Sequence, residues 1–170
     1  VLGGAFRMTP GGKGANQAVA AQRAGAQVTF ITALGDDTFG TDSRLRFTEE
    51  GIDIRHLAIK PDTPSGVALI LVDARGENLI AVAPGANSCL LPADVAQATA
   101  AFHDARMTIL QLEIPLDTVL TAVELASQQR CPVLLNPAPM PPDGLPDALL
   151  RQVDILTPNE GELLDLAPSA

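Results

Sequence analysis

The chain contains 170 residues, of which 46% are hydrophobic, and it carries a formal net charge of −9 at pH 7. This length and hydrophobic content suffice for one substantial globular core. The negative charge argues against nucleic acid and anionic membranes as partners, because both attract basic surfaces, and no apolar run reaches the length that spans a bilayer. Cys89 and Cys131 match no metal-binding or redox spacing, so we expect two reduced thiols in a cytoplasmic protein.

The beginning of the sequence predicts alternating strands and helices. A short strand over residues 1–8 leads into a glycine turn, which opens an alanine-rich helix over residues 15–24. The continuous apolar run at residues 28–34 is typical of a buried parallel strand. Another short strand is expected over residues 53–59.

Two adjacent carboxylates, Asp36 and Asp37, precede a helix that is expected to run to Glu50. Paired carboxylates can bind a metal ion, but a helix begins directly after them and no further ligand is spaced nearby. We therefore expect one of the two aspartates to cap this helix. Gly51 occupies the position at which glycine commonly ends a helix.

A glycine-containing connection joins two apolar strands, which are expected over residues 66–72 and 78–83. Strands at this separation, with Gly76 between them, predict a β-hairpin. Because a hairpin interrupts the strand–helix order, we expect it to form a small sheet apart from the main one.

From Pro92 onward the strand–helix alternation resumes. Helices are expected over residues 92–101, 116–129 and 146–150 and from residue 159, and strands over residues 107–112, 133–136 and 153–157. Strands that alternate with helices predict an α/β fold with a parallel sheet covered on both faces. In such a sheet ligands bind beyond the carboxyl ends of the strands.

The most informative stretch is the glycine turn, which reads PGGKGANQ over residues 10–17. Its glycines let a ligand approach the backbone, and the free N–H groups of the following helical turn favour electron-rich oxygens. Together with the Lys13 ammonium and the Asn16 amide, they suit a polyhydroxylated or anionic small molecule. A phosphate-binding P-loop would need Ser or Thr at Gly14, and a dinucleotide fingerprint would need glycine at Gln17. From these residues alone, a turn that only starts a helix explains the stretch equally well.

Two other segments follow predicted strands at their carboxyl ends. Glu113 could accept hydrogen bonds from two hydroxyl groups, or it could simply favour the start of the helix after Pro115. Asn159 and Glu162 lie three residues apart at a helix start, and an amide beside a carboxylate suits Mg²⁺ held against phosphate. The same two residues fit a capping box, and their local pattern alone favours that interpretation.

These motifs resemble those of the ribokinase-like carbohydrate kinase family. The similarity, strongest to the ribokinases, lies in GGKGANQAVA at residues 11–20, in the Gln-Leu-Glu-x-Pro segment that contains Glu113, and in the Asn-x-x-Glu element at residues 159–162. It covers the chain almost end to end but only the first half or so of a family member. It implies a three-layer α/β sandwich with a mostly parallel central sheet plus a small β lid. The lid strands would lie at about 1–8 and 66–83, and the α/β core at 11–59 and 84–170.

The resemblance also implies an activity: transfer of the γ-phosphoryl group of ATP to the 5-hydroxyl of D-ribose. The residues that it assigns to sugar binding are Gly12, Lys13, Gly14, Ala15, Asn16 and Glu113. Asn159 would serve the nucleotide phosphates and Glu162 the magnesium ion. The family's catalytic base is an aspartate in a Gly-Ala-Gly-Asp motif, which these 170 residues lack. We therefore assign no catalytic residue and expect the base, with a potassium site, beyond Ala170.

Two alternatives stay open at this point. The chain could be a truncated, catalytically inactive kinase-like fragment, or it could belong to a sister kinase for another sugar or a nucleoside. In the family a strand with a sugar-binding Asn-x-Asp motif precedes the position of Val1. The expected ligands are a sugar and ATP, with no nucleic acid or membrane partner, and pairing of two lids is the expected route to a homodimer.

Overall fold

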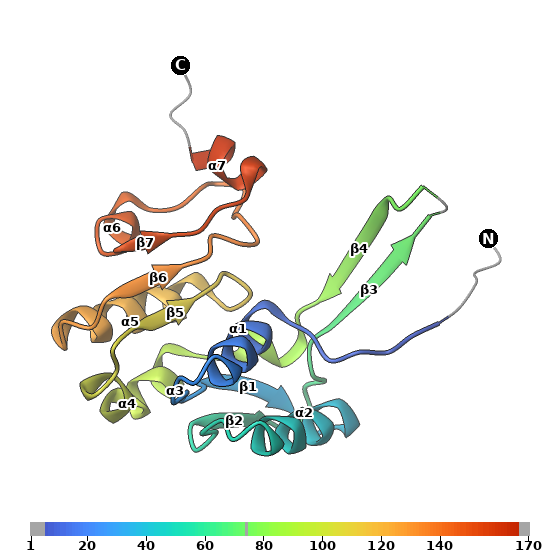
Figure 1. The fold of residues 1–170 in the computed structure, drawn as a ribbon, viewed down its shortest axis with the longest axis horizontal. Helices are drawn as coiled ribbons and strands as arrows, with labels where there is room; N and C mark the ends of the chain where they lie inside the picture. Colours follow the sequence, from blue (N-terminus) through green and yellow to red (C-terminus); the bar gives the residue numbers. More distant parts are fainter. Residues whose placement is uncertain (1–5, 74, 167–170) are drawn as a thin grey trace.

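The computed structural model describes residues 6–73 and 75–166 (Figure 1). The helices alternate with strands along most of the chain. The helical elements are α1 Lys13–Arg23, α2 Thr38–Glu49, the 3₁₀ helix η1 Gly85–Cys89, α3 Pro92–Gln97, α4 Thr99–His103, α5 Leu116–Gln128, α6 Asp147–Leu150 and α7 Glu160–Leu166. The strands are β1 Thr32–Gly35, β2 Leu57–Lys60, β3 Val67–Val72, β4 Asn78–Ala83, β5 Thr108–Leu110, β6 Val133–Leu135 and β7 Ile155–Leu156.

Strand pairing divides these elements into three sheets. β1 pairs with β2, and β6 lies between β5 and β7, with every one of these pairs parallel. Among the described strands, only β3 and β4 pair antiparallel, in a sheet of their own. The α/β fold with mostly parallel strands is therefore confirmed. Within the described part of the chain, however, no ladder joins β1 to β5, so the parallel strands lie in two sheets rather than one.

The largest core lies where helix α5 packs against β5 and β6. Val119, Val123 and Ala126 recur at helical spacing, and all three are fully buried against the sheet. The polar group on this face is also satisfied, because the Thr118 hydroxyl donates a hydrogen bond of 2.7 Å to the carbonyl of Leu90. The packing of α5 against β5 and β6 therefore fixes the position at which β5 ends.

A second core joins α1 and α2 to the chain around β1 and β2. It centres on Ala18, Phe47 and Ile52. The rings of Phe30 and Phe47 meet edge to face, with centroids 5.3 Å apart. This core packs against one face of α1. The first turn of the helix lies next to the segment that follows β5.

The predicted hairpin forms, and Figure 1 shows it projecting away from the rest of the chain. Val67 pairs with Ala83 at the base and Val72 with Asn78 near the turn. Every residue of both strands is exposed, although most are apolar. The turn is stabilised by Asp73, whose carboxylate accepts hydrogen bonds from the amides of Arg75 and Glu77.

The hairpin leaves the core at a tightly bonded point that we call the hairpin junction, formed by Gly35, Asp37, Gly40 and Ser65. Of the two aspartates expected to cap α2, Asp37 does so: its carboxylate accepts from the amide of Gly40 at 2.7 Å and from that of Ser65 at 2.8 Å. The Ser65 hydroxyl donates to Asp37 and accepts from the Gly35 amide. A Cβ at Gly40 would overlap the carbonyl oxygen of Gly35, so the backbones touch directly.

Some predicted elements differ from those observed. Phe6 to Met8 belong to no strand and their side chains are largely exposed, because no described strand lies beside them; the rest of the strand predicted over residues 1–8 lies outside the described residues. The helix predicted over residues 92–101 is divided into α3 and α4 at Ala98, whose backbone departs from helical angles. No helix in the described chain is long and apolar enough to cross a membrane.

Candidate functional site

The start of helix α1 is completed by a residue distant in the sequence. Gly12 precedes the helix with φ 95°, in the left-handed region, and has no side chain to cap it. The amide of Lys13 instead donates a hydrogen bond of 2.7 Å to Oε2 of Glu113, across 100 residues of sequence. The carboxylate thus satisfies a helix N–H that would otherwise lack a partner, and it lies where the helix dipole favours a negative charge.

A second contact lies beside the first. The side-chain amide of Gln111 donates a hydrogen bond to Oε1 of Gln17, the residue one turn along α1 from Lys13. Gly14 lies between the two contacts, and a Cβ at Gly14 would be 2.9 Å from Oε1 of Gln111. Two side chains that follow β5 therefore dock on one face of α1.

The backbone after β5 is held in place by the chain after β6. The amide of Asn136 donates to the carbonyl of Leu110 at 2.9 Å, and the amide of Leu112 donates to that of Ala138 at 3.0 Å. The two segments thus stay hydrogen-bonded to each other past the ends of the strands. Gln111 and Glu113 consequently project from a fixed backbone.

Several polar groups near the start of α1 have no partner among the described residues. Within residues 6–73 and 75–166, no hydrogen bond engages Oε1 of Glu113, and no salt bridge engages the Lys13 ammonium. Asn16 is exposed, whereas the side chain of Ala15 packs against the core between α1 and α2. An acceptor, an amide and a cation therefore remain available around a stretch of accessible glycine backbone.

The two residues expected at the phosphate side, Asn159 and Glu162, are also brought together. The Asn159 amides donate to the Glu162 carboxylate, from the backbone at 2.9 Å and from the side chain at 2.8 Å. The Glu162 backbone amide donates back to Oδ1 of Asn159 at 2.9 Å. The capping box considered from the sequence is therefore formed.

This arrangement limits what kind of metal could bind there. Among the described side chains, no group of three His, Cys, Asp or Glu residues could hold an ion. Glu162 offers one carboxylate whose oxygens keep further lone pairs beyond those used by Asn159. A single carboxylate at an open edge fits a hydrated Mg²⁺ that binds mainly to phosphate, and it does not fit a dedicated protein cage.

One residue at the same edge was missed from the sequence. Asn136 directly follows β6, and its side-chain amide donates a hydrogen bond of 2.8 Å to the carbonyl of Thr157, just after β7. It therefore ties the end of β6 to the loop that leads to Asn159. The signal was present, because Asn136 is a polar residue at the carboxyl end of a predicted parallel strand, as Glu113 is.

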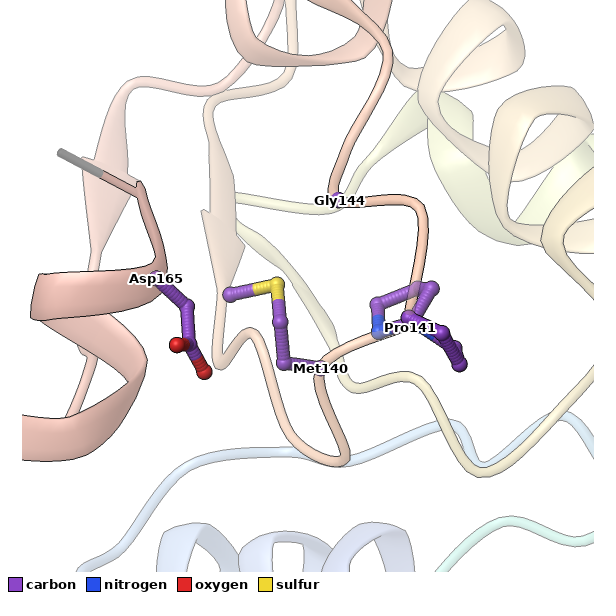
Figure 2. Close-up of a pocket in the computed structure, with 5 residues that line it drawn as sticks. Met140, Pro141, Gly144 and Asp165 are labelled. Atoms are coloured by element: carbon purple, nitrogen blue, oxygen red, sulfur yellow. The ribbon is translucent and has the colours of Figure 1, made fainter. Parts of the chain in front are cut away.

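A hollow of about 300 Å³ lies near this edge, between the loop after β6 and helix α7 (Figure 2). It is lined by Met140, Pro141, Pro142, Gly144 and Asp165. None of the predicted site residues lines it. We therefore regard it as a surface feature distinct from the candidate site.

The fold agrees with the family comparison: the chain belongs to the pfkB family of carbohydrate kinases, whose model matches residues 1–170. Among individual proteins, it is 43% identical over 157 residues to the ribokinase of Haemophilus influenzae, covering 92% of this chain and 51% of that protein. It is 39% identical over 159 residues to the deoxyribokinase of Salmonella typhi, covering 94% of this chain and 52% of that protein. The chain thus spans about half the length of the curated relatives it matches.

Solved structures agree with this assignment. The ribokinase from Giardia lamblia superposes with a TM-score of 0.90 at 32% identity, covering 99% of this chain and 53% of that one. The Arabidopsis thaliana ribokinase complexed with ribose and ATP gives a TM-score of 0.78 at 27% identity, with coverages of 92% and 51%. The family resemblance drawn from the motifs is confirmed, and so is the α/β fold.

Proposed function

We propose that the complete protein is an ATP-dependent ribokinase, which transfers the γ-phosphoryl group of ATP to the 5-hydroxyl of D-ribose. The observation that carries this proposal is the hydrogen bond between the Lys13 amide and Glu113. It joins the glycine motif to the segment after β5 and leaves one oxygen of Glu113 open beside them. The relatives and the ribose-containing structure support ribose as the substrate.

In this proposal the sugar binds at the start of α1. Gly12 is exposed and carries no side chain, so hydroxyl groups can approach the backbone there. Gly14 contributes only backbone atoms, because Gln111 fills the space where its side chain would lie. Asn16 can both donate and accept hydrogen bonds, and Glu113 accepts from hydroxyl donors. Lys13 contributes a cation, and Ala15 contributes through its backbone, since its methyl group packs into the core.

The phosphate side of the proposed site lies at the start of α7. Asn159 would contact the phosphate groups of ATP, and Glu162 would hold a hydrated Mg²⁺ against them. When bound, the ion offsets charge on the phosphoryl oxygens, which is the main requirement of phosphoryl transfer. The capping box holds both side chains at this edge before any ligand binds. We assign no residue of this chain to the proposed K⁺ site.

The proposed base for the sugar hydroxyl is not assigned to these residues, which contain no Gly-Ala-Gly-Asp motif. We expect the purified 170-residue chain to release no ADP in the presence of ribose, ATP and Mg²⁺. A coupled ADP assay tests this expectation, with a full-length ribokinase as the positive control. Robust turnover by the 170 residues would contradict our placement of the base.

A second candidate function is favoured by the deoxyribokinase relative. The two substrates differ by the hydroxyl at C2, so a site built to hydrogen-bond that group would discriminate strongly between them. Measuring kcat/KM of the full-length protein with ribose, 2-deoxyribose, fructose and inosine distinguishes the candidates. A preference for ribose supports the proposal, and a preference for any other compound replaces it.

We also propose that the β3–β4 hairpin closes over the sugar and pairs with the hairpin of a second copy. Leu69, Leu71 and Leu79 are 64–68% exposed, although they are large and apolar. Burying such side chains against a partner would be favourable. Light scattering on the full-length protein tests this: we expect a dimer for the parent and a monomer for Leu69→Asp with Leu79→Asp. A monomeric parent would overturn the proposal.

A further inference from the structure

The contact between α1 and the chain after β5 contains more than the groups assigned to the sugar. Glu113 reaches the Lys13 amide, and two residues earlier Gln111 reaches Gln17. Lys13 and Gln17 are four residues apart on α1, so they lie on the same face of the helix. The two bonds therefore act on the same pair of elements, side by side.

Gln111 also limits how closely α1 can approach. Its Oε1 lies directly over Gly14, where a Cβ would come within 2.9 Å. Gln111 and Gln17 are both half-buried, so water competes less for their amides than it would at an open surface. The amide pair thus fixes both the spacing and the lateral alignment of the helix against the end of β5.

We propose that Gln17 and Gln111 form a positioning pair that keeps Glu113 bonded to the Lys13 amide and thereby sets the affinity for the sugar. This inference rests on the proposed sugar site, but neither glutamine needs to touch the sugar. Without the pair, the side chain of Glu113 can leave the helix start, and its free oxygen is no longer held beside Gly12 and Lys13.

The chain offers a matched set of variants for this idea. In Gln17→Glu or Gln111→Glu, the remaining amide can rotate to donate to the new carboxylate, so a donor and an acceptor still face each other. In the double variant two carboxylates face each other with no donor and with like charges. Each single variant therefore controls for the added charge, and only the double variant lacks the bond.

Kinetics of the full-length protein give the first measurement. We expect each single variant to keep the KM for ribose within about threefold of the parent value, because the bond survives. We expect the double variant to raise this KM by about tenfold or more, with kcat changed much less. A purely structural role would lower the melting temperature of the double variant without this selective effect on KM. Equal KM values in the parent and the double variant would overturn the proposal.

The second measurement needs no sugar and so separates this inference from the proposed function. In full-length protein labelled with [¹⁵N]lysine, the Lys13 amide signal is identified by its loss in Lys13→Arg. The Glu113→Ala variant shows the chemical shift of the Lys13 amide when the contact with the carboxylate is absent. We expect the double variant to move the signal toward that position, and each single variant to leave it near the parent position. An unmoved signal in the double variant overturns the positioning role, whether or not the parent binds ribose.

A second double variant is used if the double glutamate variant does not fold. Gln17→Met with Gln111→Met keeps similar volume and removes both amides, so it tests the bond without added charge. We expect the same displacement of the Lys13 signal. A signal at the parent position would show that packing alone holds Glu113.

Discussion

The two helix starts of the candidate site are completed in opposite ways. At α7, Asn159 and Glu162 satisfy each other through three hydrogen bonds within four residues of sequence. At α1, Gly12 offers no capping side chain, and the Lys13 amide depends on Glu113 from a distant part of the chain. The first arrangement is local and the second is tertiary.

This difference separates the two sides of the site in their dependence on the fold. The cap of α7 can form wherever its few residues become helical, so the proposed phosphate side depends on local contacts. The start of α1 is complete only after β5 has paired with β6 and brought Glu113 into place. The proposed sugar side should therefore respond to any change that loosens α1 from β5, whereas the phosphate side should not.

The largest expected effect is that of Glu113→Ala in the full-length protein. The change removes the acceptor of the Lys13 amide and a proposed sugar contact together. We expect the KM for ribose to rise about 10- to 100-fold, since each lost hydrogen bond that leaves a partner unpaired costs roughly 1–3 kcal/mol. Steady-state kinetics test this, with Glu113→Gln as the control that keeps an acceptor. An unchanged KM in Glu113→Ala would remove Glu113 from the sugar site.

Asn16→Ala should affect the sugar and leave the helix intact. Asn16 is exposed, and its loss removes a proposed contact without removing the bond between Lys13 and Glu113. We expect a KM for ribose about tenfold higher, from roughly 1–2 kcal/mol, at a melting temperature close to that of the parent. A variant that melts early while binding ribose normally would contradict this assignment.

Glu162→Gln tests the local side of the comparison. The amide keeps an acceptor for Asn159 but loses the charge that is proposed to hold hydrated Mg²⁺. We expect a lower kcat and a higher Mg²⁺ requirement, with the KM for ribose within about twofold of the parent because the two sides are independent. The measurement is kinetics with ribose and Mg²⁺ titrated separately. If ribose binding weakens and the Mg²⁺ dependence stays the same, Asn159 and Glu162 serve only as a helix cap.

The smallest effect is expected at α2, whose cap combines both arrangements. Hydrogen bonds from the amides of Ser65 and Gly40 hold the pKa of the Asp37 carboxyl below its ordinary value. The stabilisation is therefore fully present above the unfolded pKa, near 4, and is lost as pH falls through the lower folded pKa. At neutral pH we expect Asp37→Ala to lower the free energy of unfolding by about 1 kcal/mol. Urea unfolding at several pH values tests this, and a parent–variant difference that grows toward acidic pH would contradict it.

The same distinction explains what could be predicted from the sequence. A cap of α2 at Asp36 or Asp37, the hairpin and the pairing of Asn159 with Glu162 follow from residues close in sequence. The structure contains all three, with the cap at Asp37. The bond between Gln17 and Gln111 joins residues 94 positions apart, and neither side chain carries a local signal for it. The resemblance to a known family predicted that Glu113 and the glycine turn belong to one site. It did not predict the hydrogen bond between Glu113 and the Lys13 amide.

The lengths of the strands could not be predicted accurately from the sequence, for a related reason. Hydrophobic patterns located every strand from residue 28 onward but overestimated most of them, and β7 is reduced to Ile155–Leu156. The length of a ladder depends on where its partner strand runs, which a single segment does not encode. For the same reason, the sequence did not reveal that the parallel strands divide into two sheets.

The hairpin junction has a consequence for which substitutions this chain tolerates. A Cβ at Gly40 would overlap the carbonyl oxygen of Gly35, and a Cβ at Gly35 would overlap the backbone of residues 63–65, so even a methyl group at either glycine would force these segments apart. The strands β3 and β4 look like core in the sequence, yet their side chains are exposed, and polar replacements there cost the fold little. In a library of all single substitutions scored by protein abundance, the apolar hairpin should be permissive and two glycines beside it should accept no replacement. Selection for folding alone would therefore conserve the residues of the hairpin junction. The residues of the hairpin would be conserved only through the contacts that they make with a ligand or partner.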